Sequence, residues 1–180
     1  DLNENWANQS QDWRCPACGR QKQQIVRVTR QDVLFAKLEL HHDHIHEYIS
    51  NKLKSHFGND WPRKIPKGTY DLEHLGSLLI ERFEKTIICA DCNSADAEAK
   101  KRIPGIHSSF SFRVEEIRQF IRAKPNTSHE ISTDKAIAIW QDQAQDFQLR
   151  LNLAEQLFGH IIRGEVSRTP NIYLERDPTA

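Results

Sequence analysis

The 180-residue chain carries equal numbers of basic and acidic residues, so its formal net charge at pH 7 is zero. This balance argues against a protein that coats nucleic acid by charge alone. Its length and 38% hydrophobic content suit one compact domain with an appendage, and no apolar run approaches the roughly 18 residues of a membrane span. We therefore expect a cytoplasmic protein with no membrane partner. Because it contains no methionine, we also expect a fragment of a longer protein.

Hydrophobic periodicity predicts a mixture of helices and strands, and hence an α+β fold. In chain order, the expected elements are strands at 24–28 and 35–42, a helix at 45–57, a basic loop at 58–69, a helix at 71–85, a strand at 86–92, and helices at 93–105, 111–125 and 133–163. A polar, loosely ordered tail is expected after the last helix.

The last predicted helix carries apolar residues at alternating steps of three and four, which is typical of a coiled coil. These residues are Ile137, Trp140, Ala144, Phe147, Leu151, Ala154, Phe158 and Ile161. Two interpretations remain open: the helix packs along its own domain, or it forms a homodimer or docks to a targeting partner. Leu153, Leu157 and Ile162 widen the stripe, which favours packing on more than one neighbour.

Four cysteines occur as two pairs, "CPAC" at 15–18 and "CADC" at 89–92. A two-residue spacing lets both thiolates of a pair reach one tetrahedral zinc ion. The alternatives are two disulfides, which are typical of secreted proteins, and a redox-active pair. The pairing favours a structural Zn²⁺ bound by Cys15, Cys18, Cys89 and Cys92, which would hold two distant parts of the chain together.

Between the cysteine pairs, "HHDHIH" (41–46) gathers four histidines and an aspartate directly behind a predicted strand. Clustered imidazoles indicate a metal site. An internal cluster mixed with Asp43 does not resemble a purification tag. His41 and His42 could instead bind a second structural zinc together with His44 or His46. The remaining histidines, including His129, are expected to be ordinary surface or core residues.

The order of "CPAC", "HHDH" and "CADCN", followed by a helix, resembles the HNH, or ββα-metal, endonuclease family. The pattern is most similar to the endonuclease VII-like and zinc-stapled HNH restriction-type enzymes, and it covers residues 15 to about 103. The resemblance implies a two-stranded ribbon and a helix that hold one divalent cation over a scissile phosphate. The implied function is metal-dependent hydrolysis of DNA, in restriction, phage defence or as the nuclease part of a larger targeting system.

The resemblance also assigns roles to individual residues. His42 would be the general base, and His41 and Asn93 would bind a catalytic Mg²⁺ or Mn²⁺. His41 stands where the family often has an aspartate, so the cation would have two neutral ligands. Asp43 and His44 are expected to support the site.

By the same resemblance, residues 1–105 would form a zinc-stapled nuclease domain with a helical and basic insertion at 45–85, and residues 106–180 a helical C-terminal region. Segment 51–68 holds five basic residues against one acid, and could be a solvated loop or contact double-stranded DNA. The expected phosphate contacts are Lys64, Lys67, Lys100 and Lys101. The alternative function is a non-catalytic zinc module that binds nucleic acid or protein.

Overall fold

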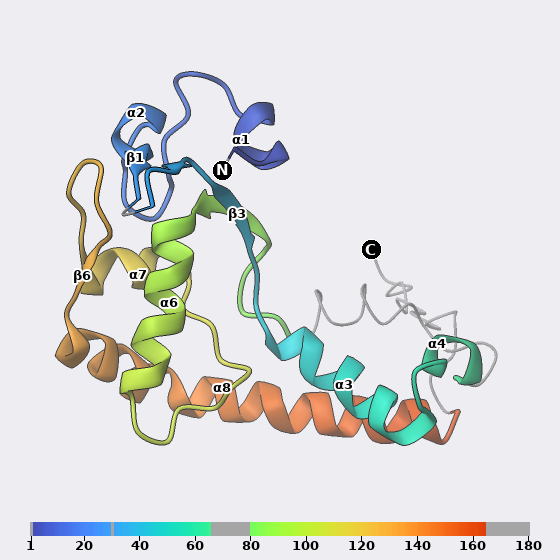
Figure 1. The fold of residues 1–180 in the computed structure, drawn as a ribbon. Helices are drawn as coiled ribbons and strands as arrows, with labels where there is room; N and C mark the ends of the chain where they lie inside the picture. The colour runs from blue at the N-terminus through green and yellow to red at the C-terminus, as the bar shows by residue number, and fades with distance from the viewer. Residues whose placement is uncertain (1, 30, 66–79, 165–180) are drawn as a thin grey trace, which may run out of the picture.

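The computed structural model describes residues 2–29, 31–65 and 80–164. Within these ranges the chain forms a mixed α and β fold with three two-stranded antiparallel sheets (Figure 1). The helices are α1 (Glu4–Asn8), α2 (Lys22–Ile25), α3 (Ile45–Phe57), α4 (Trp61–Lys64), α6 (Ala90–Arg102), α7 (Val114–Phe120) and α8 (Thr133–Ile162). The strand pairs are β1 (Arg27–Val28) with β2 (Leu34–Phe35), β3 (Leu38–His41) with β4 (Thr86–Cys89), and β5 (Ile121–Arg122) with β6 (Glu130–Ile131).

The centre of the fold is the β3–β4 pair with α6 folded back over it (Figure 1). Leu38 pairs with Cys89 at one end of the ladder, and His41 pairs with Thr86 at the other. Strand β4 runs directly into α6, because Cys89 both ends the strand and caps the helix. The small side chains of Ala95 and Ala99 are buried and let α6 pack closely. One face of α6 therefore lies against the strand that carries the histidine cluster.

Helices α7 and α8 complete the core on the other side of α6. Four phenylalanines there are almost completely buried: Phe110, Phe112, Phe120 and Phe147. Their rings meet edge to face, with 5.0 Å between the centroids of Phe110 and Phe112 and 4.8 Å between Phe110 and Trp140. Such pairs contribute about 0.5–1.5 kcal/mol each beyond the burial of their area. A single hydrophobic core thus crosses the predicted boundary after residue 105.

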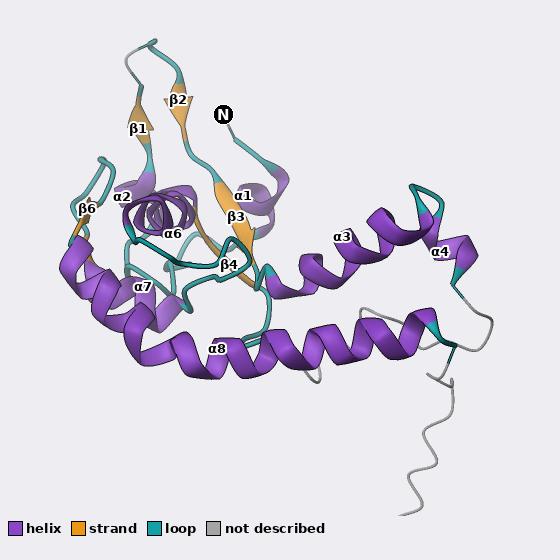
Figure 2. Ribbon diagram, turned by 90° about the horizontal axis from the view of Figure 1, so that it is seen from below, coloured by secondary structure: helices purple, strands orange, loops and turns teal. Residues whose placement is uncertain are grey.

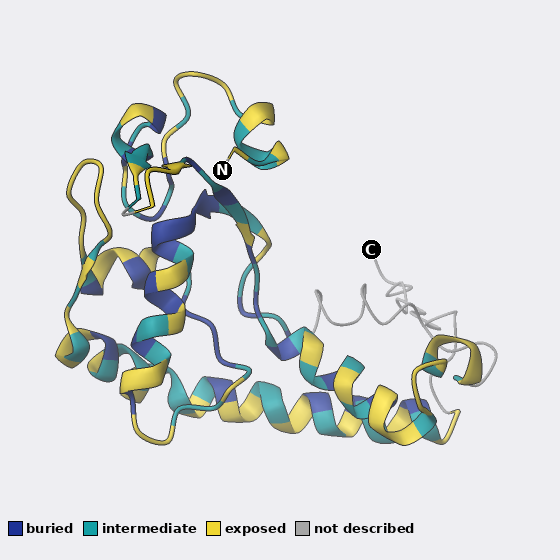
Figure 3. Cartoon of the chain, viewed as in Figure 1, coloured by how far each residue is buried: buried dark blue, intermediate teal, exposed yellow. Residues whose placement is uncertain are grey.

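Helix α3 leaves the centre of the fold and packs beside α8, and together they form an extension (Figure 2). Both helices alternate buried and exposed positions along their length (Figure 3). Tyr48 and Lys52 of α3 donate hydrogen bonds to Glu155 of α8, while Leu53 and Ile161 are buried.

The apolar stripe predicted on α8 packs against the chain's own core. Phe147, Ala154 and Ile161 are buried, and Trp140 and Phe158 are partly buried against the same core. The structure therefore agrees with the interpretation that the helix packs along its own domain. A homodimer or a targeting partner that binds this helix stays a prediction. No helix within the described ranges is long and apolar enough to cross a bilayer.

The helix predictions for 45–57 and 133–163 agree with α3 and α8, but several other boundaries are wrong. Helix α6 begins at Ala90 and not at 93, so Cys92 lies within its first turn. The helix predicted at 111–125 is limited to Val114–Phe120 and is followed directly by β5. Residues 110–113 are neither helix nor strand. Phe110 and Phe112 are buried there and the Phe112 amide donates to Asp96, so tertiary packing overrides helix propensity.

The predicted strands also differ from the structure. Residues 24–28 begin as the end of α2 and become strand only at Arg27. The strand predicted at 35–42 is divided between β2 and β3, which pair with different partners. The strand predicted at 86–92 ends at Cys89. Of the helix predicted at 71–85, residues 80–85 are not helical, and the part before residue 80 lies outside the described residues.

Candidate metal centres

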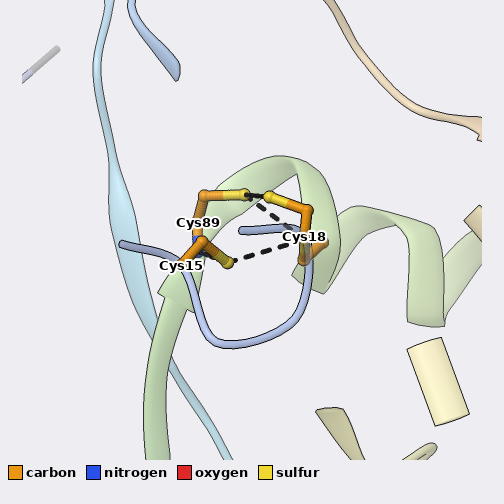
Figure 4. Close-up of side chains that lie close together, drawn as sticks. Cys15, Cys18 and Cys89 are labelled. Carbon is orange, nitrogen blue, oxygen red and sulfur yellow. Dashed lines mark hydrogen bonds between the residues drawn. The ribbon is translucent and has the colours of Figure 1, made fainter. Parts of the chain in front are cut away.

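Four cysteine sulfurs converge where β4 passes into α6 (Figure 4). Cys15 and Cys18 come from a tight loop in which the Gly19 amide donates to the Cys15 carbonyl over 2.8 Å. Gly19 has a φ of 74°, a left-handed conformation that glycine adopts without strain. Cys89 and Cys92 come from the end of β4 and the first turn of α6. All four sulfurs lie within 4.8 Å of one another.

The separations between the sulfurs fit a tetrahedral zinc ion. Cys15 Sγ lies 3.7 Å from Cys92 Sγ, Cys18 Sγ lies 3.8 Å from Cys89 Sγ, and Cys89 Sγ lies 3.4 Å from Cys92 Sγ. Four Zn–S bonds of about 2.3 Å in a tetrahedron place the sulfurs about 3.8 Å apart. All four cysteines are free, so the disulfide alternative does not apply. The predicted four-cysteine centre is confirmed, and it is consistent with structural Zn²⁺.

Two cationic side chains surround this centre. Arg20, only 4% exposed, donates to Cys18 Sγ over 3.4 Å and to Cys89 Sγ over 3.3 Å, and it pairs with Asp91 at 2.7 Å. His129 Nε2 lies 3.1 Å from Cys92 Sγ. Four thiolates around one Zn²⁺ carry a net charge of −2, which these neighbours offset.

The position of His129 on the cysteine cluster is a correction, because the sequence prediction treated this residue as an ordinary histidine. Burial disfavours its charged form, but hydrogen bonds with Cys18 and Cys89 outweigh that effect and raise the pKa of His129 to about 9. No spacing signal links His129 to either cysteine pair, since it is 37 positions from Cys92. Arg20 directly follows the "CPACG" loop, and this adjacency in the sequence could have indicated its place at the cysteine centre.

Asn93 follows the last cysteine, and its side chain reaches the end of β3. His41 Nδ1 and Asn93 Oδ1 are 3.1 Å apart. The His41 side chain is 1% exposed and stacks on Phe83, with 5.1 Å between the ring centroids. The structure thus brings together the two residues that the sequence predicts as ligands of a second metal.

Hydrogen-bond partners determine which atoms of this pair face each other. His41 Nε2 lies 2.7 Å from the Phe112 carbonyl oxygen, which can only accept, so Nε2 carries a hydrogen. Asn93 Nδ2 donates to Glu39 Oε2 over 2.5 Å, which turns the amide oxygen toward His41. When His41 is neutral, two lone-pair atoms, Nδ1 and Oδ1, therefore face each other. A proton or a cation between them would remove their repulsion.

His42 and His44 lie side by side at the end of β3, with their rings stacked at a centroid distance of 4.8 Å. His42 is half-buried, and its Nε2 lies 3.0 Å from Glu47 Oε1. That hydrogen bond lowers the pKa of Glu47. Burial, and then the positive charge of Lys100, lower the pKa of His44, so His44 is neutral at pH 7.

Asp43 holds backbone segments together. It is 1% exposed, and its two oxygens accept hydrogen bonds from the Ile45 amide at 3.2 Å and the Arg82 amide at 2.7 Å. Burial raises the pKa of Asp43, and the two amides partly offset that effect. Asp43 thus fixes the beginning of α3 to the segment that precedes β4, and its oxygens point away from solvent.

Of the four lysines predicted to contact phosphate, the three that the structure describes do not form one surface. Lys100 is held by Asp96 at 2.7 Å and by the Phe110 carbonyl at 3.1 Å, with 15% of its side chain exposed. Lys101 is exposed and pairs with Glu98. Lys64 lies in α4 at the far end of the α3 extension (Figure 1) and donates to the Phe57 carbonyl. Lys67 lies outside the described residues.

Comparisons with known proteins give no match: no protein-family model fits the sequence, and no curated protein or solved structure is detectably similar to it. The chain is therefore an α+β protein with a four-cysteine, zinc-like centre, and its function must be argued from its own residues.

Proposed function

We propose that the protein is a metal-dependent DNA endonuclease of the HNH type. The observation that carries the proposal is the His41 Nδ1–Asn93 Oδ1 pair, held 3.1 Å apart beside a four-cysteine centre. The order of the cysteine pairs, the histidine cluster and Asn93 along the sequence supports it independently. Restriction, phage defence or service in a larger targeting system remain the proposed biological settings.

The geometry of the pair suits an octahedral cation. Two adjacent ligands with metal bonds of about 2.1 Å lie about 3.0 Å apart in an octahedron. A tetrahedral cation with the same bonds would separate its ligands by about 3.4 Å. The observed 3.1 Å is compatible with two ligands of an octahedral cation such as Mg²⁺ or Mn²⁺, and it is also an ordinary hydrogen-bond length. When bound, such a cation would neutralise phosphate charge and stabilise the departing oxygen.

His42 is the proposed general base. Both ring nitrogens of His42 lie near acceptors: Nε2 is 3.0 Å from Glu47 Oε1, and Nδ1 is 3.4 Å from the Leu40 carbonyl oxygen. The shorter contact, with a charged acceptor, favours a hydrogen on Nε2, so Nδ1 is the proposed basic nitrogen. Nδ1 would take a proton from water while the water oxygen attacks phosphorus and the bond to the 3′-oxygen breaks. The products would be a 5′-phosphate and, once the leaving oxygen is protonated, a 3′-hydroxyl. The Leu40 carbonyl, 3.4 Å from Nδ1, would accept a hydrogen bond from the protonated ring.

The surroundings of the pair also suit a phosphate. Asn93 lies near the N-terminus of α6, where the helix dipole favours an anion. The zinc-like centre fixes this end of the helix against β3, which ends at His41 and is followed directly by His42. His44, neutral and stacked on His42, adds a hydrogen-bonding group on the same side.

Plasmid cleavage tests the proposal. Wild-type protein, His42→Ala, Asn93→Ala and the control His56→Ala would be incubated with supercoiled plasmid in Mg²⁺, in Mn²⁺ and in EDTA. His56 is an exposed histidine at the end of α3, so its removal controls for the loss of an imidazole. We expect metal-dependent cleavage by wild type and His56→Ala, and a loss of about 100-fold or more in His42→Ala. A protein that binds the plasmid but does not cleave it in any metal would instead support the non-catalytic zinc module.

A further inference from the structure

We propose that Glu39 is a positioning residue for the second metal centre, because it fixes the orientation of the Asn93 amide. This inference rests on the proposed function. Glu39 and His41 lie two positions apart on β3, so both side chains extend from the same face of the strand toward α6. Asn93 contacts both of them, through Nδ2 to Glu39 and through Oδ1 to His41.

An asparagine needs such a partner in order to bind a cation. Rotation of the amide by half a turn exchanges its oxygen and nitrogen with little change in shape. In the exchanged orientation, Asn93 Nδ2 would donate to His41 Nδ1 and form a satisfied hydrogen bond where the cation would lie. A cation binds the oxygen and not the NH₂ group. The orientation therefore decides whether the site is open or blocked.

Glu39 favours the open orientation because a carboxylate oxygen accepts the Asn93 NH₂ and would repel its oxygen. The carboxylate is itself held in place, since Lys37 Nζ lies 2.8 Å from the other oxygen, Oε1. Glu39 also places a negative charge next to two neutral ligands. Orientation and charge are therefore two distinct ways in which Glu39 could act, and they must be separated by experiment.

Two substitutions of Glu39 remove these features. Glu39→Met has similar length and provides no oxygen. Glu39→Gln removes the charge and leaves one oxygen for two donors, Asn93 Nδ2 and Lys37 Nζ, so its NH₂ group would face one of them. The measurement is the Mn²⁺ affinity of the zinc-loaded, 180-residue chain by calorimetry, with plasmid cleavage in parallel. We expect Glu39→Met to weaken Mn²⁺ binding about tenfold, as is usual for the loss of an outer partner of a metal ligand. Glu39→Gln should also weaken Mn²⁺ binding, because Lys37 Nζ competes with Asn93 Nδ2 for the single oxygen. The control Glu98→Met, on the exposed face of α6, should match wild type.

A second pair of variants tests the orientation directly. Asn93→Asp presents an oxygen in either orientation, so the effect of Glu39→Met should disappear in the Asn93→Asp background. Zinc content and the thermal transition of each variant establish that it is folded. The inference is overturned if Glu39→Met binds Mn²⁺ like wild type, or if the loss persists in the Asn93→Asp background, which would leave charge as the explanation. A wild-type protein that binds no Mn²⁺ would overturn the proposed function itself, and this inference with it.

Discussion

Removal of one cysteine ligand should separate the two parts of the chain that the zinc-like centre joins. Cys89→Ser removes one of four sulfurs, and the loop that the centre closes is long, because Cys18 and Cys89 are 71 positions apart. Cross-linking a loop of that length reduces the entropy of the unfolded chain by an amount equivalent to about 4 kcal/mol. A typical domain is stable by only about 5–15 kcal/mol. We therefore expect Cys89→Ser to lose a large part of its folding free energy.

Urea unfolding followed by circular dichroism measures this loss, and elemental analysis gives the zinc content of each sample. Wild type should contain close to one zinc per chain, and wild type stripped by a chelator should unfold at a lower urea midpoint that returns when Zn²⁺ is restored. Cys89→Ser should resemble the stripped protein and should not respond to Zn²⁺. If Cys89→Ser lacks zinc but keeps the wild-type midpoint, the centre does not hold the fold together, and the reasoning is refuted.

Three further predictions concern the core, the α3–α8 contact and the surroundings of zinc. Phe110→Ala should lower the free energy of unfolding, measured in urea, by about 3–5 kcal/mol because it leaves a cavity among aromatic rings. The control Leu149→Ala, at a site 63% exposed, should change it by less than about 0.5 kcal/mol. Similar losses at both sites would contradict the assigned core. Hydrogen bonds from Lys52 and then Tyr48 lower the pKa of Glu155, so their stabilisation is present above the ordinary value of 4.5 and is lost as the pH falls through the lowered value. Glu155→Gln should therefore melt below wild type at pH 7, and the two melting temperatures should converge once the pH falls below the lowered pKa of Glu155; a constant difference would argue against this contact. Arg20→Met should release zinc to a colorimetric chelator about tenfold faster, because two thiolates lose their hydrogen-bond donor; an unchanged rate would remove Arg20 from the account.

The parts of the fold that could be predicted from sequence are those set by short-range spacing. Two-residue spacing predicts that Cys15 and Cys18 bind one ion together, and helical periodicity predicts α3 and α8 closely. The same periodicity cannot tell which neighbour covers α8, and the structure shows that the chain's own core does. The position of Asn93 beside His41 was predicted by the resemblance to a family and by adjacency to Cys92.

The parts that could not be predicted depend on contacts between distant segments. His129 reaches Cys92 because the segment between β5 and β6 packs on the cysteine loop, where Arg20 donates to the carbonyls of Lys124 and Thr127. Local sequence contains no sign of that packing. The role of Glu39 follows from alternation along β3, but only the structure shows which side chain of α6 it meets. The helix predicted over 111–125 is too long because burial of Phe112 outweighs the local preference for helix.

The central claim is that a divalent cation binds between His41 and Asn93, apart from the ion bound by the cysteines. The most direct test is anomalous diffraction at the manganese edge from crystals of the zinc-loaded protein soaked in Mn²⁺. The account predicts a manganese peak about 2.1 Å from both His41 Nδ1 and Asn93 Oδ1, distinct from a zinc peak at the four sulfurs. A zinc peak at the cysteines with no manganese between His41 and Asn93, at saturating Mn²⁺, would contradict it.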